Sequence, residues 1–305
     1  MRWRVATASD PQLAGRAEFA LERCPDCDSA ATVGNAEAPA AMYEGGTYNQ
    51  SRGFAARLIG PLRALAERDR LRFVSHLPPG AKVLEVGAGD GKLVAAMRDA
   101  GLDARGIDPS PAACRAAAAI GADVANVGVD EAEVGPASLD AVVIWHALEH
   151  FDQPAESLDR VRSWLAPGGA LIVAVPNLAS LQAKLGGDRW FHQDVPRHRV
   201  HLTPAGATAL LARTGFATER IRHLLVEQNP LGMWQTLLSR LTTERDFAFR
   251  LLKRDLPENL RDSRGRDLAV TAVAVPLLAP VALLAELVAG LARRGGSIVV
   301  QGRTA

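Results

Sequence analysis

The chain has 305 residues, 48% of them hydrophobic, which is enough for one complete α/β domain with additional segments. Its 35 Lys and Arg residues balance 34 Asp and Glu residues, and this argues against a nucleic-acid-binding protein that relies on overall positive charge. The three cysteines offer no disulfide framework, and the first 30 residues lack the apolar core of a secretory signal. We therefore expect a cytoplasmic protein.

The first segment, residues 1–52, is expected to be an N-terminal arm because it shows no clear periodicity. Its one distinctive motif is Cys24-Pro25-Asp26-Cys27. Zinc is usually held by four ligands, so one C-x-x-C pair supplies half of a site. We therefore predict no metal site in a single chain. A helix is then expected over residues 53–77.

The central motif begins with a buried strand over residues 82–86. The strand breaks into the turn Gly87-Ala88-Gly89-Asp90-Gly91, and a helix follows over residues 92–100. A strand, a glycine-rich turn and a helix open a nucleotide-binding α/β unit, in which glycines let the backbone approach a ligand closely. The spacing E-x-G-x-G-x-G differs from the dinucleotide fingerprint G-x-G-x-x-G, because Glu85 would repel a pyrophosphate.

Strand and helix patterns then alternate along the chain. Asp108 ends the second strand, where a carboxylate commonly binds ribose hydroxyls. Thr203 and Pro204 start the last helix of this series, which ends near Arg213. A Pro-Gly-Gly turn is expected at residues 167–169. The expected strands are residues 82–86, 104–107, 123–127, 139–145, 170–175, 217–226 and 297–301.

Over residues 82–177, this order of motifs resembles the class I S-adenosylmethionine-dependent methyltransferases. The resemblance implies an α/β fold with a doubly wound, seven-stranded, mostly parallel sheet and helices on both faces. It implies S-adenosylmethionine as the cofactor and methyl transfer to a small-molecule or lipid-linked acceptor, with O-methylation favoured. Two alternatives remain: a nicotinamide-dependent oxidoreductase, and a catalytically silent cofactor-binding or membrane-scaffolding module.

The resemblance also implies roles for individual residues. Glu85 would hold the ammonium region of the methionine part, Asp108 the ribose hydroxyls, and Asp130 would lie near the adenine. Some similar enzymes carry an N-terminal zinc ribbon with two C-x-x-C pairs, so the single pair here is either a ribbon remnant or a plain turn. Tyr48 either contacts the cofactor or only packs. The remaining expected cofactor contacts are Gly87, Ala88, Gly89, Gly91, Pro109, Trp145 and His146.

Residues 188–201 contain three His, three Arg and two aromatic residues. Ligands of an open parallel sheet bind beyond the carboxyl ends of its strands, so we expect this loop to border the methyl acceptor. His198 and His201 are candidate general bases, as is His146 after the fourth strand. Alternatively, the histidines tie the loop to the backbone. Metal binding is less favoured, since arginines accompany them.

Residues 228–294 form an expected helical insertion between the last two strands. The insertion is basic at first, and residues 268–285 then carry no charge but include Pro276 and Pro280. A basic segment beside an apolar one suits shallow docking on an anionic membrane, although prolines disfavour a straight spanning helix. The alternative is a kinked helix pair packed in the protein or in a homodimer. The expected segments are therefore residues 1–52, 53–227, 228–294 and 295–305.

Overall fold

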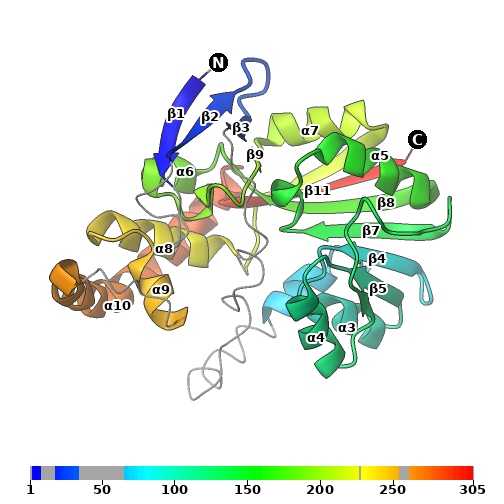
Figure 1. Ribbon diagram of the computed structural model, residues 1–305, viewed down its shortest axis with the longest axis horizontal. Helices are drawn as coiled ribbons and strands as arrows, with labels where there is room; N and C mark the ends of the chain where they lie inside the picture. The colour runs from blue at the N-terminus through cyan, green and yellow to red at the C-terminus, as the bar shows by residue number, and fades with distance from the viewer. Residues whose placement is uncertain (1, 8–17, 34–64, 227, 254–260, 305) are drawn as a thin grey trace. The chain divides into compact units, whose positions relative to one another are not determined.

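The computed structural model describes residues 2–7, 18–33, 65–226, 228–253 and 261–304 (Figure 1). The chain forms two compact units, each built from several segments. The four-stranded unit comprises residues 1–42, 176–203 and 223–298. The seven-stranded unit comprises residues 43–175, 204–222 and 299–305.

These units cut across the expected segments, because residues 176–203 group with the N-terminal arm and the helical insertion. The reason is hydrogen bonding: the loop after the fifth strand pairs with the N-terminal strands. Tyr48 and residues 53–64 of the expected helix over 53–77 lie outside the described residues. Residues 65–71 are helical, so that helix ends before Leu77.

The seven-stranded sheet has the strand order β10-β11-β8-β7-β4-β5-β6. Five of its strands pair in parallel, whereas β10 and β11 pair antiparallel. Its strands are β4 (Lys82–Val86), β5 (Asp103–Ile107), β6 (Val124–Ala125), β7 (Leu139–Trp145), β8 (Leu165–Pro176), β10 (Phe216–Arg222) and β11 (Ser297–Thr304). The expected seven-stranded, mostly parallel sheet is confirmed.

Four helices alternate with these strands: α3 (Lys92–Asp99), α4 (Pro111–Ala119), α5 (Pro154–Trp164) and α7 (Pro204–Arg213). Helix α4 begins as its sequence predicts, since the Ser110 hydroxyl accepts a hydrogen bond from the Ala113 N–H at 3.3 Å and Pro111 takes the first helical position. The central strand β7 is a continuous apolar run because both faces of a parallel sheet are covered; residues 141–144 are at most 1% exposed.

Several expected boundaries are wrong. Residues 167–169 do not form a turn before the fifth strand but lie inside β8. In the pairing of β7 with β8, Leu139 pairs with Leu165, whereas Ala141 pairs with Ala170. The extra residues of β8 between these two pairs form a bulge, in which Gly168 has φ +74°. The third strand is only two residues long, and the sixth ends at Arg222.

The four-stranded unit contains the antiparallel order β1-β2-β3-β9. Its strands are β1 (Arg2–Thr7), β2 (Glu18–Arg23), β3 (Ala30–Val33) and β9 (Val200–His201). Its helices are α6 (Leu181–Gly186), α8 (Asn229–Leu241), α9 (Phe247–Lys253) and α10 (Arg261–Leu291), with short 3-10 turns η3 (Gly187–Arg189) and η4 (Phe191–Gln193). The N-terminal arm therefore contains strands that its irregular sequence did not predict.

Helix α10 runs through both prolines as one helix of 31 residues. Pro276 and Pro280 therefore do not end the helix. The Trp234 indole of α8 donates a hydrogen bond to the Val275 carbonyl at 3.0 Å, and Leu238 packs with Ala274. These contacts with α8 stabilise the helix in the region where the two prolines each remove a backbone donor.

Candidate functional site

The glycine turn after β4 leaves space for a ligand at one position. Gly87, Gly89 and Gly91 have φ values of +74°, +55° and +70°. A Cβ atom at Gly87 would overlap the Cβ of Ala147, and one at Gly91 would lie 2.6 Å from the Cβ of Ala122. A Cβ at Gly89 would meet nothing within 4 Å. The outer glycines are therefore needed for packing, whereas Gly89 borders open space that a ligand could enter.

Asp108 is held rigidly at the carboxyl end of β5. Its Oδ2 accepts a hydrogen bond from the Gly89 N–H at 2.8 Å, and its Oδ1 accepts one from the Ser110 N–H at 2.8 Å. The Asn126 amide donates to the Asp108 carbonyl at 3.0 Å. Backbone donors thus fix the carboxylate beside the glycine turn, in a position suited to binding vicinal hydroxyls.

Glu85 lies within β4 and is 3% exposed. It pairs in the sheet with Gly106 on β5 and with Val143 on β7. Glu85 stands two residues before the first glycine of the turn, where a carboxylate could bind an ammonium group of a ligand.

The carboxyl end of β7 brings a histidine and a glutamate together. His146 adopts φ +51°, and its Nδ1 lies 3.2 Å from Oε1 of Glu149 in the 3-10 turn η2 (Leu148–His150). Glu149 is 3% exposed. Because Ala147 abuts Gly87, this histidine lies in the segment next to the glycine turn. His146 was predicted from the sequence but Glu149 was not, although the H-x-x-E spacing was the available signal.

Two other expected contacts lie in the same unit. Trp145 is 6% exposed, and its indole nitrogen has no hydrogen-bond partner within the described structure. The centroid of its ring lies 5.6 Å from the centroid of the Phe73 ring. Asp130 is exposed, and its Oδ1 lies 3.5 Å from the Ser157 hydroxyl of α5. The glycines, Ala88, Asp108, Pro109, Asp130, Trp145 and His146 thus share the seven-stranded unit.

The histidines of the loop belong instead to the four-stranded unit. His198 Nδ1 lies 2.8 Å from the carbonyl of His192, so this nitrogen carries the proton. The Thr32 hydroxyl donates to the His198 carbonyl at 2.7 Å and therefore accepts from His201 Nε2 at 3.0 Å. Both side chains are buried, at 6% and 4% exposure; His198 bonds to the backbone of its own loop, and His201 bonds to the Thr32 side chain of β3.

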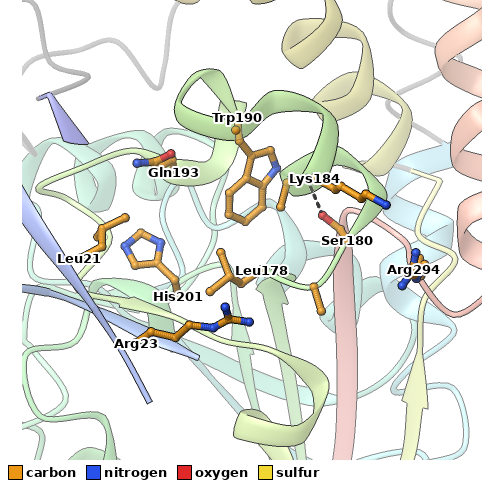
Figure 2. Close-up of a pocket in the computed structure, with 12 residues that line it drawn as sticks. Leu21, Arg23, Leu178, Ser180, Lys184, Trp190, Gln193, His201 and Arg294 are labelled. Atoms are coloured by element: carbon orange, nitrogen blue, oxygen red, sulfur yellow. Dashed lines mark hydrogen bonds between the residues drawn. The ribbon is translucent and has the colours of Figure 1, made fainter. Parts of the chain in front are cut away.

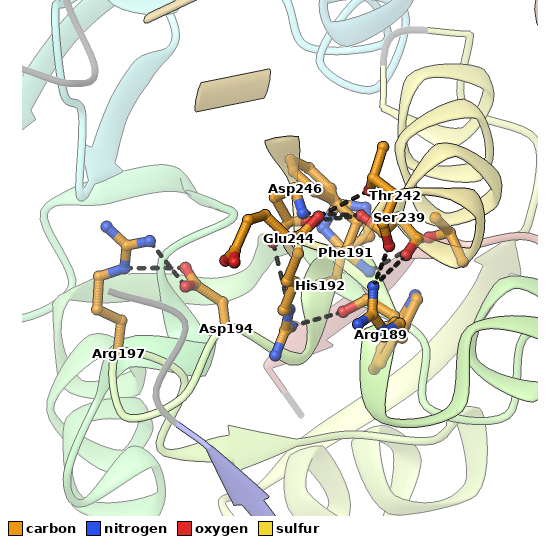
Figure 3. A network of polar contacts seen from close by, with 12 residues as sticks. Arg189, Phe191, His192, Asp194, Arg197, Ser239, Thr242, Glu244 and Asp246 are labelled. Carbon is orange, nitrogen blue, oxygen red and sulfur yellow. Dashed lines mark hydrogen bonds and ion pairs between the residues drawn. The ribbon is translucent and has the colours of Figure 1, made fainter. Parts of the chain in front are cut away.

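The arginines of this loop also make structural contacts (Figure 3). Arg189 donates hydrogen bonds to the Ser239, Thr242 and Thr243 carbonyls at 2.6, 2.8 and 2.9 Å, and so caps the carboxyl end of α8. Arg197 forms two hydrogen bonds with the Asp194 carboxylate, at 3.0 and 2.7 Å. These contacts explain much of the loop's unusual composition.

Cys24 and Cys27 occupy the turn between β2 and β3. Hydrogen bonds from the backbone of Asp26 and of Cys27 lower the pKa of the Cys24 thiol below its ordinary value. Among the described residues, no third ligand of a type that binds metal joins this pair. The absence of zinc stays a prediction.

Comparison with known proteins identifies the seven-stranded unit. The profile of a family described as "Methyltransferase domain" matches residues 58–221. The chain belongs to this methyltransferase family. It is a class I enzyme with S-adenosylmethionine as its cofactor, and the open space at Gly89 with the fixed carboxylate of Asp108 fits that cofactor.

Two curated relatives are named ubiquinone biosynthesis O-methyltransferase. The protein of Xylella fastidiosa (strain 9a5c) is 30% identical over 206 residues, which cover 62% of this chain and 80% of the relative. The protein of Xanthomonas axonopodis pv. citri (strain 306) is 30% identical over 182 residues, covering 55% of this chain and 76% of the relative.

Solved structures agree on the fold. A methyltransferase of Archaeoglobus fulgidus has a TM-score of 0.51 at 16% identity, covering 83% of this chain and 100% of the other. The [4+2]-cyclase SpnF also has a TM-score of 0.51, at 19% identity, covering 77% of this chain and 81% of the other. At these identities the likeness concerns the fold alone.

Proposed function

We propose that this methyltransferase methylates a hydroxyl oxygen of a small-molecule acceptor, with His146 as the general base. The observation that carries the proposal is the contact of 3.2 Å between His146 Nδ1 and Glu149 Oε1 at the carboxyl end of β7. The names of the two curated relatives support oxygen as the acceptor atom.

The cofactor-binding residues follow from the same unit. Glu85 would bind the ammonium region, the backbone at Gly89 would approach the cofactor closely, and Asp108 would accept hydrogen bonds from the ribose hydroxyls. Ala88, Pro109, Asp130 and Trp145 remain proposed neighbours of the cofactor. When bound, S-adenosylmethionine supplies an electrophilic methyl group.

The chain's own groups then have two tasks. Glu149 accepts a hydrogen bond from His146 Nδ1, which orients the ring and leaves Nε2 as the proton acceptor. His146 Nε2 takes the proton from the acceptor hydroxyl as that oxygen attacks. The positive φ of His146 shows that the backbone holds this side chain at a conformational cost, a feature often found at functional sites.

Replacing His146 with Gln and Glu149 with Gln tests this role. We expect H146Q to lower turnover about 10²-fold at neutral pH, the size of a general-base contribution, with cofactor affinity nearly unchanged. E149Q should lower turnover less, because its amide oxygen can still accept the hydrogen bond from His146 Nδ1 and orient the ring. An H146Q enzyme with full turnover from pH 6 to 9 would contradict the proposal.

We propose further that the acceptor is lipid-linked and that α10 contacts the membrane. Within the described residues, one helix, spanning residues 263–291, is long and apolar enough to cross a bilayer by length and composition. Only 17% of its most apolar window is buried in the protein. The stronger support is the pattern of its exposed residues.

Six of the exposed residues of α10 form an apolar stripe at intervals of three or four. They are Val273, Leu277, Val281, Leu284, Val288 and Leu291, each between 52% and 70% exposed. A helix at a water-exposed surface normally presents polar residues there, so a stripe of this length indicates an interaction surface. Exposed arginines at both ends, Arg264, Arg266 and Arg293, suit an anionic bilayer.

A further inference from the structure

A cavity of about 360 Å³ lies wholly within the four-stranded unit (Figure 2). Its walls come from β2, from the segment of residues 178–193, from β9 and from Arg294 after α10. None of the residues of the glycine turn lines it. Its volume falls within the range of about 300–1,000 Å³ typical of small-molecule pockets.

Two buried polar side chains line this cavity without hydrogen-bond partners. Gln193 is 2% exposed, and both its amide nitrogen and its amide oxygen are buried and unbonded within the described structure. Trp190 is also 2% exposed, and its indole N–H is unbonded in the same way. Buried polar groups are nearly always hydrogen-bonded in proteins, so these atoms indicate where a ligand's polar atoms would bind.

The charge of the wall is positive. Arg23, Lys184 and Arg294 line the cavity, and none of its lining residues is acidic. Arg23 already forms an ion pair with Asp28 at 3.0 Å, so part of its charge is neutralised locally. Lys184 and Arg294 are exposed, and Figure 2 shows them on the same side of the pocket, beyond Ser180. The positive charge that has no ion-pair partner among the described residues therefore lies at that side.

Apart from Ser180 and His201, the rest of the wall is apolar. Leu178 lies beneath the indole ring of Trp190 in Figure 2, and Leu21 of β2 is 1% exposed. An aromatic ring and aliphatic side chains favour a flat or apolar ligand body. The cavity thus combines an apolar wall, buried donors and an acceptor, and a cationic side.

We propose that this pocket binds a small organic anion. Its apolar body would pack between Trp190 and Leu178, and its carboxylate or phosphate would face Lys184 and Arg294. The Gln193 amide and the Trp190 N–H would bond polar atoms of the same ligand. Its lining residues differ from those proposed to bind the cofactor, and the proposal does not depend on which acceptor is methylated.

Calorimetric titration of the full-length protein tests this site with three probes of similar size. Benzoate and phenyl phosphate carry the two anionic groups, and benzyl alcohol is the neutral analogue. The protein is first saturated with S-adenosylhomocysteine so that the cofactor site is filled. We expect at least one anion to bind tenfold more tightly than benzyl alcohol. Equal binding of all three probes would overturn the proposal, as would binding only when S-adenosylhomocysteine is absent.

Variants then locate the bound anion. We expect the double variant K184Q/R294Q to bind the anion at least tenfold more weakly, and Q193L to bind it at least fivefold more weakly. R264Q removes an exposed arginine of the same unit outside the pocket and should change affinity less than twofold. The melting temperature and S-adenosylhomocysteine affinity of each variant report whether it is folded. Unchanged anion affinity in folded K184Q/R294Q and Q193L would contradict the site.

Discussion

The carboxylate of Asp108 accepts a hydrogen bond from the backbone N–H of Gly89 at 2.8 Å. This contact joins the ends of two neighbouring parallel strands, β4 and β5. It fixes the acidic group beside the one glycine of the turn that borders open space. The turn and the carboxylate are therefore preorganised as one site by the protein itself.

Replacing Asp108 with Ala should weaken S-adenosylhomocysteine binding tenfold or more, because it removes an acceptor for ribose hydroxyls and frees the Gly89 N–H. Isothermal titration calorimetry measures the change. Asp103 begins the same strand at its other end and is half exposed, so D103A is a matched control that should bind normally. Equal affinity of D108A and D103A would exclude Asp108 from the cofactor site.

The base role predicted for His198 and His201 can be separated from the backbone-tying role that their hydrogen bonds favour. Asn can replace the Nδ1 donor of His198, and Gln can replace the Nε2 donor of His201. We expect H198A and H201A to lower the melting temperature, and H198N and H201Q to restore both stability and turnover. If either histidine is the base, its amide variant should instead lose about 10²-fold in turnover while remaining stable.

Because the carboxyl group of Glu286 is buried, we expect the free energy of unfolding to depend on pH. Burial raises the pKa of its carboxyl group above the ordinary value, although Gln182 and the Gly296 N–H, which hydrogen-bond to it, oppose the shift. Between the ordinary and the raised pKa the folded state is protonated and the unfolded state is ionised. The free energy of unfolding should therefore fall as pH rises through this window and level off above it.

E286Q should flatten this decline, since the amide stays neutral and can donate to the Gln182 Oε1, which is buried without a partner in the described structure. Melting temperatures between pH 4.5 and 8 measure the effect. Glu219 is half exposed, and E219Q should keep the dependence of the unmodified protein. A decline in E286Q as steep as that of E219Q would contradict this assignment.

The apolar stripe on α10 predicts binding to anionic liposomes. Leu277 and Leu284 are 65% and 62% exposed, so L277Q/L284Q should leave the fold intact. Each buried methylene contributes about 0.8 kcal/mol, so the double variant should bind liposomes more than tenfold more weakly. L252Q, on the 66% exposed Leu252 of α9, is the control in a flotation assay at low salt. A dimeric protein that never floats would show a subunit interface instead.

The sequence by itself predicted most elements of the seven-stranded sheet. The apolar runs predicted its strands, and the glycine turn and Asp108 predicted where two of these strands end. Such predictions succeed because strands buried on both faces and tight turns require particular residues locally. The predicted bounds of strand β7 and of α3, the helix that follows the glycine turn, are correct to within one residue. Local side-chain size and backbone freedom suffice for such elements.

Only the tertiary structure decided the rest. Nothing local in residues 1–40 predicted a sheet that pairs with Val200 and His201, since pairing across more than 160 residues depends on the whole fold. The prolines of α10 disfavoured a straight helix, yet one continuous helix packs on α8. Likewise, the arginines and histidines between residues 188 and 201 resembled a site, but the hydrogen bonds of Arg189 to the Ser239 carbonyl and of His201 to the Thr32 hydroxyl exist only in the folded chain. Long-range packing and hydrogen bonding determine these features. They could not be predicted because the residues around each segment do not indicate which distant residue it will contact.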